Sequence, residues 1–209
     1  MINKIRVAEV RDAEAFVAIK NQLPITRADG STTTGGFLLG TDLETYKTYI
    51  TQGYCLVAEV NNQVVGFGIM FTDKMLRESD VWQRRHLATW NIALSDYENR
   101  NLCYFEQLAF LSGHRRLALA LAYNLVKQTF DKGYHTLVAT TVKAPVLNLA
   151  AIPFIQAAGG LHTGNINEVY PTIGLINSDI YMLDANRFYT HAARHVLYPF
   201  FRQHTIGAS

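Results

Sequence analysis

The hydrophobic positions change their spacing near the middle of the chain. Residues Tyr104–Leu111 alternate with a period of two and are rich in aromatic and aliphatic types, which is typical of a strand. After a Ser-Gly pair the period becomes helical, and Leu117, Leu121 and Leu125 recur every four residues as part of a wide apolar stripe. The pattern predicts a strand, a tight turn and a helix that packs against a sheet.

The N-terminal part of the chain predicts a strand and two helices. Residues Ile2–Val10 have the pattern of a strand, and Asp12 is the expected N-cap of a helix over Ala13–Leu23. The sequence Thr41–Glu44 has the form of a capping box, in which the threonine hydroxyl caps a second helix that runs to Gln52.

Two apolar segments then predict an antiparallel hairpin. They are Tyr54–Val60 and Gln63–Phe71, and the two residues between them, Asn61 and Asn62, tolerate the positive φ angles of a tight turn. The glycine residues of the second strand weaken it unless another part of the molecule passes close by.

Less regular segments lie on either side of the hairpin. Residues Ile25–Gly40 are rich in Gly, Thr and Ser; a binding loop and a plain surface loop are equally good interpretations. A helix is expected from Ser79 or Asp80 to about Leu94, inside an insertion at about 72–101.

Downstream of the central helix, four more elements are expected. The helix ends at Lys132-Gly133. The expected elements are a strand at His135–Val142, a short helix from Asn148 to Ile155 that is broken or bent around Pro153, a strand at Asp179–Asp184, and a C-terminal helix at Asn186–Leu197 ahead of Pro199.

Composition narrows the class of protein. Nearly half of the 209 residues are hydrophobic, and 19 basic against 17 acidic side chains leave a net charge of only +2, which gives no reason to expect a nucleic-acid or membrane partner. We therefore expect a cytoplasmic protein with a single domain over 1–209. Cys55 and Cys103 lie in apolar strand-like surroundings and are expected to be buried rather than disulfide-bonded. The spacing of the histidines predicts no metal site.

Two arginines stand where the central helix begins. Arg115 and Arg116 occupy its first turn, although arginines normally favour the opposite end of a helix dipole. Unpaired N–H groups at a helix start and guanidinium groups both bind anions. The arrangement predicts a phosphate-binding site.

The same segment resembles the acyl-coenzyme A signature of the GNAT N-acetyltransferase superfamily, in which Arg or Gln is followed by two residues, Gly, one residue, and Gly or Ala. Arg115 and Ala120 match the ends of this signature, while Ala118 replaces its usual glycine. The order of elements, β-α-α-β-β-(insertion)-β-α-β-α-β, also matches that family from about Ile2 to Asp184. The resemblance implies an α/β (α+β) fold with a mixed, mostly antiparallel sheet that is splayed between its fourth and fifth strands, helices on both faces, and an additional C-terminal helical extension at about 186–209.

The resemblance also implies where acetyl-CoA would bind. The pantetheine arm would bond to the main chain of Leu108, Ala109 and Phe110, and the diphosphate would contact N–H groups between Arg116 and Leu121. The remaining residues implied in coenzyme binding are Leu117, Ala118, Leu119 and Ala120 of the signature, together with Asn148 and Phe154 of the following helix.

For the chemistry, Glu106 is the candidate general base because it precedes the coenzyme contacts on the same strand, although its alternation with Leu108 and Phe110 fits a solvent-facing charge equally well. Ile155 stands where family members often have a tyrosine that protonates the leaving thiolate. Tyr104, Tyr123, Tyr170 or water are the alternatives.

These observations predict an N-acetyltransferase that moves an acetyl group from acetyl-CoA, its acyl-donor substrate, to a primary amine of a small molecule or peptide. A longer acyl donor and a homodimer remain open. The alternative is a non-catalytic acyl-CoA-binding sensor or structural protein, which Ala118 and Ile155 favour slightly. The acceptor itself stays undetermined.

Overall fold

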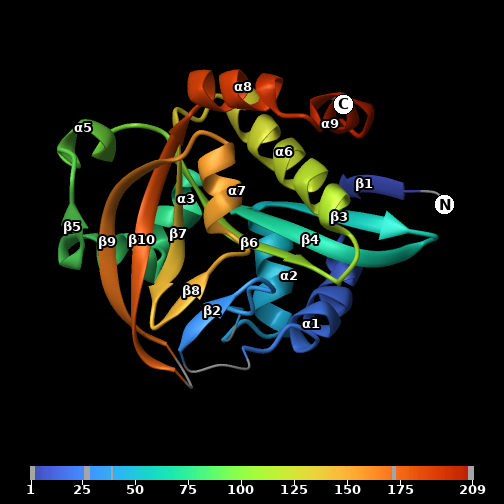
Figure 1. Cartoon of the computed structure of the whole chain (residues 1–209), viewed down its shortest axis with the longest axis horizontal. Helices are drawn as coiled ribbons and strands as arrows, with labels where there is room; N and C mark the ends of the chain where they lie inside the picture. The colour runs from blue at the N-terminus through green and yellow to red at the C-terminus, as the bar shows by residue number, and fades with distance from the viewer. Residues whose placement is uncertain (1–2, 26–28, 39, 171–172, 207–209) are drawn as a thin grey trace.

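In the computed structural model, residues 3–25, 29–38, 40–170 and 173–206 are described. Ile2, residues 26–28 and 39 of the predicted loop, and residues 207–209 of the predicted extension lie outside this part. Within it, an eight-stranded sheet with the order β1-β3-β4-β6-β7-β10-β9-β5 forms the centre (Figure 1). Its strands are β1 (Asn3–Val7), β3 (Tyr54–Val60), β4 (Gln63–Phe71), β5 (Thr89–Trp90), β6 (Leu102–Phe110), β7 (Thr136–Ala144), β9 (Leu161–Tyr170) and β10 (Gly174–Asp184).

The sheet is mixed and mostly antiparallel, as predicted. Among the described strands of this sheet, β6 and β7 form the parallel pair and the remaining neighbours are antiparallel. The β3–β4 hairpin has the predicted bounds, and Asn61 and Asn62 have φ angles of 50° and 66° in its turn. The tolerance of asparagine for positive φ therefore fixes this connection.

Helices cover both faces of the sheet, which confirms that prediction. On one face, α1 (Ala13–Asn21), α2 (Leu43–Gln52) and α3 (Asp73–Glu78) enclose an apolar core with Phe16, Tyr46 and Phe67 at its centre. On the other face, α6 (Arg115–Asp131), α8 (Ala185–Arg194) and α9 (Tyr198–Gln203) enclose a second core around Leu121 and Leu125 (Figure 1).

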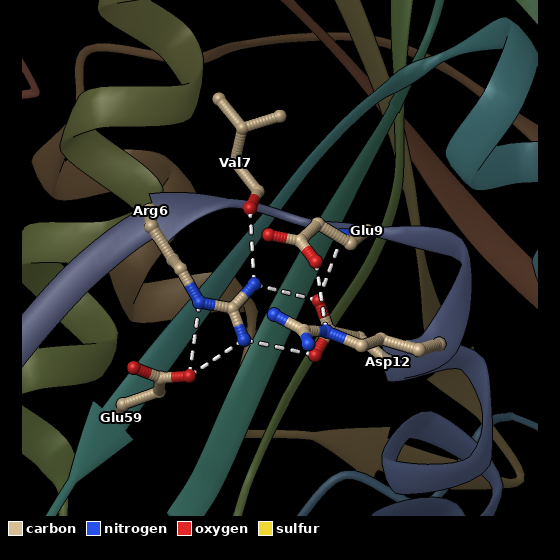
Figure 2. Close-up of polar contacts among 6 residues, drawn as sticks. Arg6, Val7, Glu9, Asp12 and Glu59 are labelled. Carbon is tan, nitrogen blue, oxygen red and sulfur yellow. Dashed lines mark hydrogen bonds and ion pairs between the residues drawn. The ribbon is translucent and has the colours of Figure 1, made fainter. Parts of the chain in front are cut away.

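The start of α1 differs from the prediction. Asp12 ends a short 3-10 helix, η1 (Val10–Asp12), but its carboxylate does not cap α1. Instead it accepts hydrogen bonds from Arg6 Nη1 at 2.6 Å, Arg6 Nη2 at 2.9 Å and the Glu9 N–H at 2.7 Å (Figure 2). Arg6 also donates to Glu59 on β3, so this arginine on β1 connects β3 to the start of α1. Pairing this buried carboxylate with a guanidinium takes precedence over capping.

The cap of α2 also lies one residue later than the predicted capping box. The Asp42 carboxylate, not the Thr41 hydroxyl, accepts the hydrogen bond from the Thr45 N–H at 2.8 Å. Thr41 is buried, and its hydroxyl accepts a hydrogen bond from Gln107 Nε2 at 3.1 Å. The Thr41 hydroxyl therefore bonds to a buried side chain, and the more exposed Asp42 caps the helix.

Segment 72–101 does not form the predicted long helix. Ser79 caps a helix as expected, but that helix, α4 (Asp80–Gln83), is short, and η2 (Arg85–Leu87), β5 and α5 (Ser95–Glu98) follow it. The reason is that Thr89 and Trp90 pair with β9 and extend the sheet, while the Trp90 indole donates to the Arg85 carbonyl. Tertiary pairing thus overrides the helical pattern.

The C-terminal half contains three further differences. β9 was not predicted, and β10 begins at Gly174 rather than Asp179. The predicted helix from Asn148 is a short strand, β8 (Val146–Asn148), that pairs in parallel with β2 (Gly30–Thr32), followed by α7 (Ile152–Ala157).

The two prolines that were expected to interrupt or follow a helix each lie at the start of one. Pro153 and Pro199 lie in the first turns of α7 and α9, where the missing N–H is not needed. The predicted C-terminal helix is consequently two helices, α8 and α9, and α9 is fastened to α6 because Asn124 Nδ2 donates to the His204 carbonyl at 3.0 Å.

Candidate functional site

The site is organised by the separation of β6 from β7. The two strands pair from Leu102–Phe105 on β6 and Thr136–Ala139 on β7, and the pairing then stops although both strands continue to Phe110 and Ala144. The fourth and fifth strands of the predicted order correspond to β6 and β7, so the predicted splay between them is confirmed. The splay leaves main-chain groups of β6 without a partner on β7.

A β-bulge at Glu106 accompanies this separation. On the other side of β6, Ile69 of β4 lies opposite Gln107 and Met70 lies opposite Phe105, so Glu106 has no opposite residue. The extra residue changes the alternation of the strand. Gln107 consequently faces α2, and Leu108 and Phe110 pack on the α6 side.

The prediction that Glu106 lies on the same face of the strand as Leu108 and Phe110 was therefore wrong. Its Oε1 lies 3.4 Å from Gln107 Nε2 on the α2 side, rather than sharing the face of Leu108. Burial raises the pKa of Glu106 from its ordinary value of 4.5 to about 7, the hydrogen bond from Gln107 opposes this rise, and the negative charge of Glu168 adds to it. A carboxyl with such a pKa can accept a proton near neutrality.

A cavity of about 580 Å³ opens at this gap. Its walls come from both faces of the sheet, because α2-side residues such as Thr41 and Arg84 and α6-side residues such as Val126 and Ile155 all line it. The cavity therefore extends through the space where β6 and β7 separate.

The predicted site residues fall into two groups. Those that line the cavity are Glu106, Leu108, Ala109, Phe110, Asn148 and Phe154. The signature residues Arg115, Arg116, Leu117, Ala118, Leu119 and Ala120 lie instead at the beginning of α6, where Arg115 and Arg116 are exposed and Leu117 and Ala120 are buried in the core.

The predicted position of the N–H cluster needs a correction. α6 already begins at Arg115, and the Ala118 N–H donates to the His114 carbonyl at 2.9 Å, so the N–H groups from Ala118 onward are used within the helix. The N–H groups that a helix leaves unpaired are those of its first turn, here Arg115 to Leu117. Arg116 also lies over the Phe200 ring of α9, with its Cζ 5.0 Å from the ring centroid.

Residues outside the predicted coenzyme site complete the cavity. Thr34 to Leu38 of the Gly, Thr and Ser-rich loop and Tyr170 of β9 line it, together with Arg84 of segment 72–101 and Glu168 of β9, two residues that the sequence did not single out. Arg84 Nη2 and Glu168 Oε1 are 3.0 Å apart and form an ion pair. No local pattern distinguishes Arg84 and Glu168 from ordinary surface charges, because only the sheet order brings them together.

The structure separates the three tyrosine candidates. Tyr123 stacks on Phe188 and Phe201 in the core around α6, away from the cavity. Tyr104 and Tyr170 both line the cavity, and the Tyr104 hydroxyl lies 2.5 Å from Thr140 Oγ1. Burial, together with the nearby Glu106 charge, raises the pKa of Tyr104, so this hydroxyl stays protonated.

The two cysteines have no place in the cavity. Cys55 and Cys103 are buried free thiols, as expected, and burial raises the pKa of Cys55 to about 12. Over the residues that the structure covers, no three His, Cys, Asp or Glu side chains come together as a metal-binding group. In the same residues, no helix combines the length and apolar character needed to cross a bilayer.

Comparison with known proteins identifies the fold. No model of a protein family matches the sequence, and no curated protein matches it. Solved structures do match: an N-acetyltransferase from Staphylococcus aureus Mu50 is 20% identical with a TM-score of 0.61 over 88% of this chain and 99% of that one.

Two further structures agree. A putative acetyltransferase from Salmonella typhimurium, described with its cofactor acetyl-CoA, is 18% identical with a TM-score of 0.61 over 88% of this chain and 94% of that chain. A GNAT-family acetyltransferase from Streptococcus pneumoniae is 17% identical with a TM-score of 0.55 over 88% of this chain and 99% of that chain. The chain therefore has the fold of the GNAT N-acetyltransferases.

Proposed function

We propose that the protein is an acetyl-CoA-dependent N-acetyltransferase that transfers the acetyl group to a primary amine. The observation that carries the proposal is the gap between β6 and β7, which places an ionisable Glu106 in the wall of a cavity that reaches both faces of the sheet.

The donor half of the cavity fits a pantetheine arm. Beyond Phe105, the main chain of β6 has no partner on β7, and Leu108, Ala109 and Phe110 line the open side. An extended chain with amide groups can bond to such an edge as an added strand. Asn148 at the end of β8 and Phe154 in the first turn of α7 line the same cavity. The Salmonella typhimurium neighbour, described with acetyl-CoA, supports this choice of donor.

The diphosphate of the donor would lie where α6 begins. The first-turn N–H groups and the positive end of the helix dipole favour an anion there, and the exposed Arg115 adds a guanidinium group. Ala118 does not conflict with this arrangement. Its N–H is bonded within the helix, so it is not one of the N–H groups proposed to contact the phosphate.

In the reaction, the Glu106 carboxylate accepts a proton from the ammonium form of the acceptor, directly or through water. The neutral nitrogen attacks the thioester carbon, the C–N bond forms, the C–S bond breaks, and the nitrogen releases its second proton to water, to which Glu106 also passes the proton that it accepted. The departing thiolate takes a proton from water or from a tyrosine hydroxyl on the cavity wall, Tyr104 or Tyr170.

The rival function is a coenzyme-binding sensor without turnover, and Ile155 favours it because this cavity residue has no proton to donate. Two measurements separate the functions. Calorimetry with acetyl-CoA tests the pocket, and thiol release with a panel of amines tests turnover. We expect micromolar binding together with thiol release, whereas binding without release from any amine would establish the sensor.

A further inference from the structure

The half of the cavity on the α2 side has apolar and aromatic walls. Phe37 and Tyr170 lie edge to face with ring centroids 5.8 Å apart, and the Tyr104 ring lies in the same cavity. Leu38 and Ile176, which are only 8% and 3% exposed, add aliphatic surface. Such walls favour a ligand with an apolar body and stabilise a cation through the faces of the rings.

The charged side chains of the cavity are mostly acidic. Among the described lining residues, Asp80, Glu106 and Glu168 are acids, Arg84 is the base, and neither lysine nor histidine occurs. A site with this excess of carboxylates attracts an ammonium group and repels an anion.

The arginine is already engaged. Its Nη2 pairs with Glu168 Oε1 at 3.0 Å, and its Nε donates to the Asp80 carbonyl at 3.2 Å. A carboxylate on the acceptor that binds the remaining N–H groups of Arg84 would lie close to the negative charge of Glu168. The arrangement selects against amino-acid acceptors, because like charges brought together in a cavity are costly.

We propose that the acceptor is a small primary amine with an aromatic body and no carboxylate group. This inference rests on the proposed acetyl transfer and adds the chemical class of the acceptor. The aromatic body contacts Phe37, Tyr170 and Tyr104, the amine lies near Glu106, and the Arg84–Glu168 pair excludes acids. The size of the cavity supports a small molecule, because 580 Å³ must also hold the pantetheine arm.

The test compares phenethylamine with phenylalanine, which differ only by the carboxylate, and includes spermidine as a polycationic amine. With the full-length protein and acetyl-CoA, we expect kcat/KM for phenethylamine to exceed that for phenylalanine by about 100-fold and that for spermidine by about 10-fold. Equal values, or a preference for phenylalanine or spermidine, would overturn the acceptor class.

A Glu168→Gln variant tests the role of the ion pair. Removing the charge of Glu168 frees Arg84 for a substrate carboxylate, so the preference for phenethylamine over phenylalanine should shrink by about 10-fold. The matched control is Glu14→Gln on the exposed surface of α1, which should keep the wild-type ratio. An unchanged ratio in a folded Glu168→Gln protein would contradict this role.

The results also separate this inference from the proposed function. Preferential acetylation of phenylalanine or spermidine leaves acetyl transfer standing and removes only the aromatic-amine acceptor. Binding of acetyl-CoA without acetylation of any amine overturns both.

Discussion

The hydroxyl of Tyr46 donates a hydrogen bond of 3.1 Å to Oε1 of Gln107. This bond joins α2 to the bulged part of β6, and Gln107 Nε2 completes the connection by donating to Thr41 Oγ1 at 3.1 Å and to Glu106 Oε1 at 3.4 Å. Gln107 is 6% exposed, so its amide group has little access to water. The bulge that presents Glu106 to the cavity is therefore held by a buried polar network rather than by the sheet alone.

Replacing Gln107 should loosen this network. Gln107→Ala removes the amide group that bonds the buried Tyr46 and Thr41 hydroxyls, so we expect the free energy of unfolding to fall by about 2 kcal/mol in chemical denaturation. The pKa of Glu106 should also rise further, because the hydrogen bond from Gln107 favours its charged form. The control is Gln63→Ala at the exposed start of β4. A similar loss in both variants would show that the buried bonds contribute nothing specific.

Glu106 should impose a pH dependence on the reaction. Because its pKa is about 7, the proton-accepting form increases as the pH rises from 6 to 8, and we expect kcat/KM to rise through this range and then level off. Glu106→Gln should lower kcat/KM at pH 8 by about 100-fold and abolish this rise, while acetyl-CoA affinity in calorimetry stays unchanged. A variant that keeps the wild-type profile would exclude Glu106 as the base.

The same carboxyl should make the unliganded protein less stable at higher pH. In the unfolded chain Glu106 ionises near its ordinary value of 4.5, but in the folded protein it holds its proton up to about pH 7. The folded state therefore binds more protons between these values, and stability decreases as the pH rises through this window.

Removing the charge should recover that loss. We expect Glu106→Gln to raise the free energy of unfolding at pH 8 by about 2 kcal/mol and to have little effect at pH 4. Denaturation at both pH values provides the comparison. A destabilised variant at pH 8 would mean that the charged carboxylate makes favourable contacts that outweigh its burial.

Much of this architecture could be predicted from local patterns. The hairpin bounds at Tyr54–Val60 and Gln63–Phe71 follow from two apolar segments around an Asn-Asn turn. The strand, turn and helix around Arg115 follow from the change of period. The glycines of β4 were expected where another part of the molecule passes close by, and a Cβ on Gly66 would indeed lie 2.3 Å from the Phe110 ring.

The features that were not predicted depend on contacts distant in sequence. β5 is a strand because β9 lies beside it, and the face of Glu106 depends on a bulge that β4 defines. The Arg84–Glu168 pair joins residues 84 positions apart. Glu106 could thus be named from its place before the expected coenzyme contacts, whereas the walls of the proposed acceptor site could be found only in the assembled sheet.

The Arg6–Asp12 pair should be important for stability and not for chemistry. The side chains of Arg6 and Asp12 are 16% and 6% exposed. Although burial disfavours the charge on Asp12, hydrogen bonds from Arg6 and the Glu9 N–H lower its pKa below the ordinary value of 3.8. Asp12→Ala should therefore lower the free energy of unfolding at pH 7 by about 3 kcal/mol, because it leaves the mostly buried Arg6 with less compensation.

The exposed pair Arg11–Glu9 provides the control for this variant. Its side chains are 77% and 54% exposed, so Arg11→Ala should change stability by about 0.5 kcal/mol or less. The deficit of Asp12→Ala should also shrink as the pH falls below 3.8, since protonation removes the same charge from the wild-type protein. Equal effects of the two variants at pH 7 would show that burial does not strengthen the Asp12 interactions.

Arg115 should contribute to donor binding more than Arg116 does. Arg115→Glu places a negative charge beside the first-turn N–H groups of α6, and we expect the affinity for acetyl-CoA to fall by about 100-fold in calorimetry. Arg116→Ala should have a smaller effect, because the Arg116 guanidinium already lies over the Phe200 ring. Arg194→Glu in the last turn of α8 introduces the same charge change on an exposed residue and should leave affinity unchanged. If Arg115→Glu binds acetyl-CoA as the wild type does, the phosphate site does not lie at the beginning of α6.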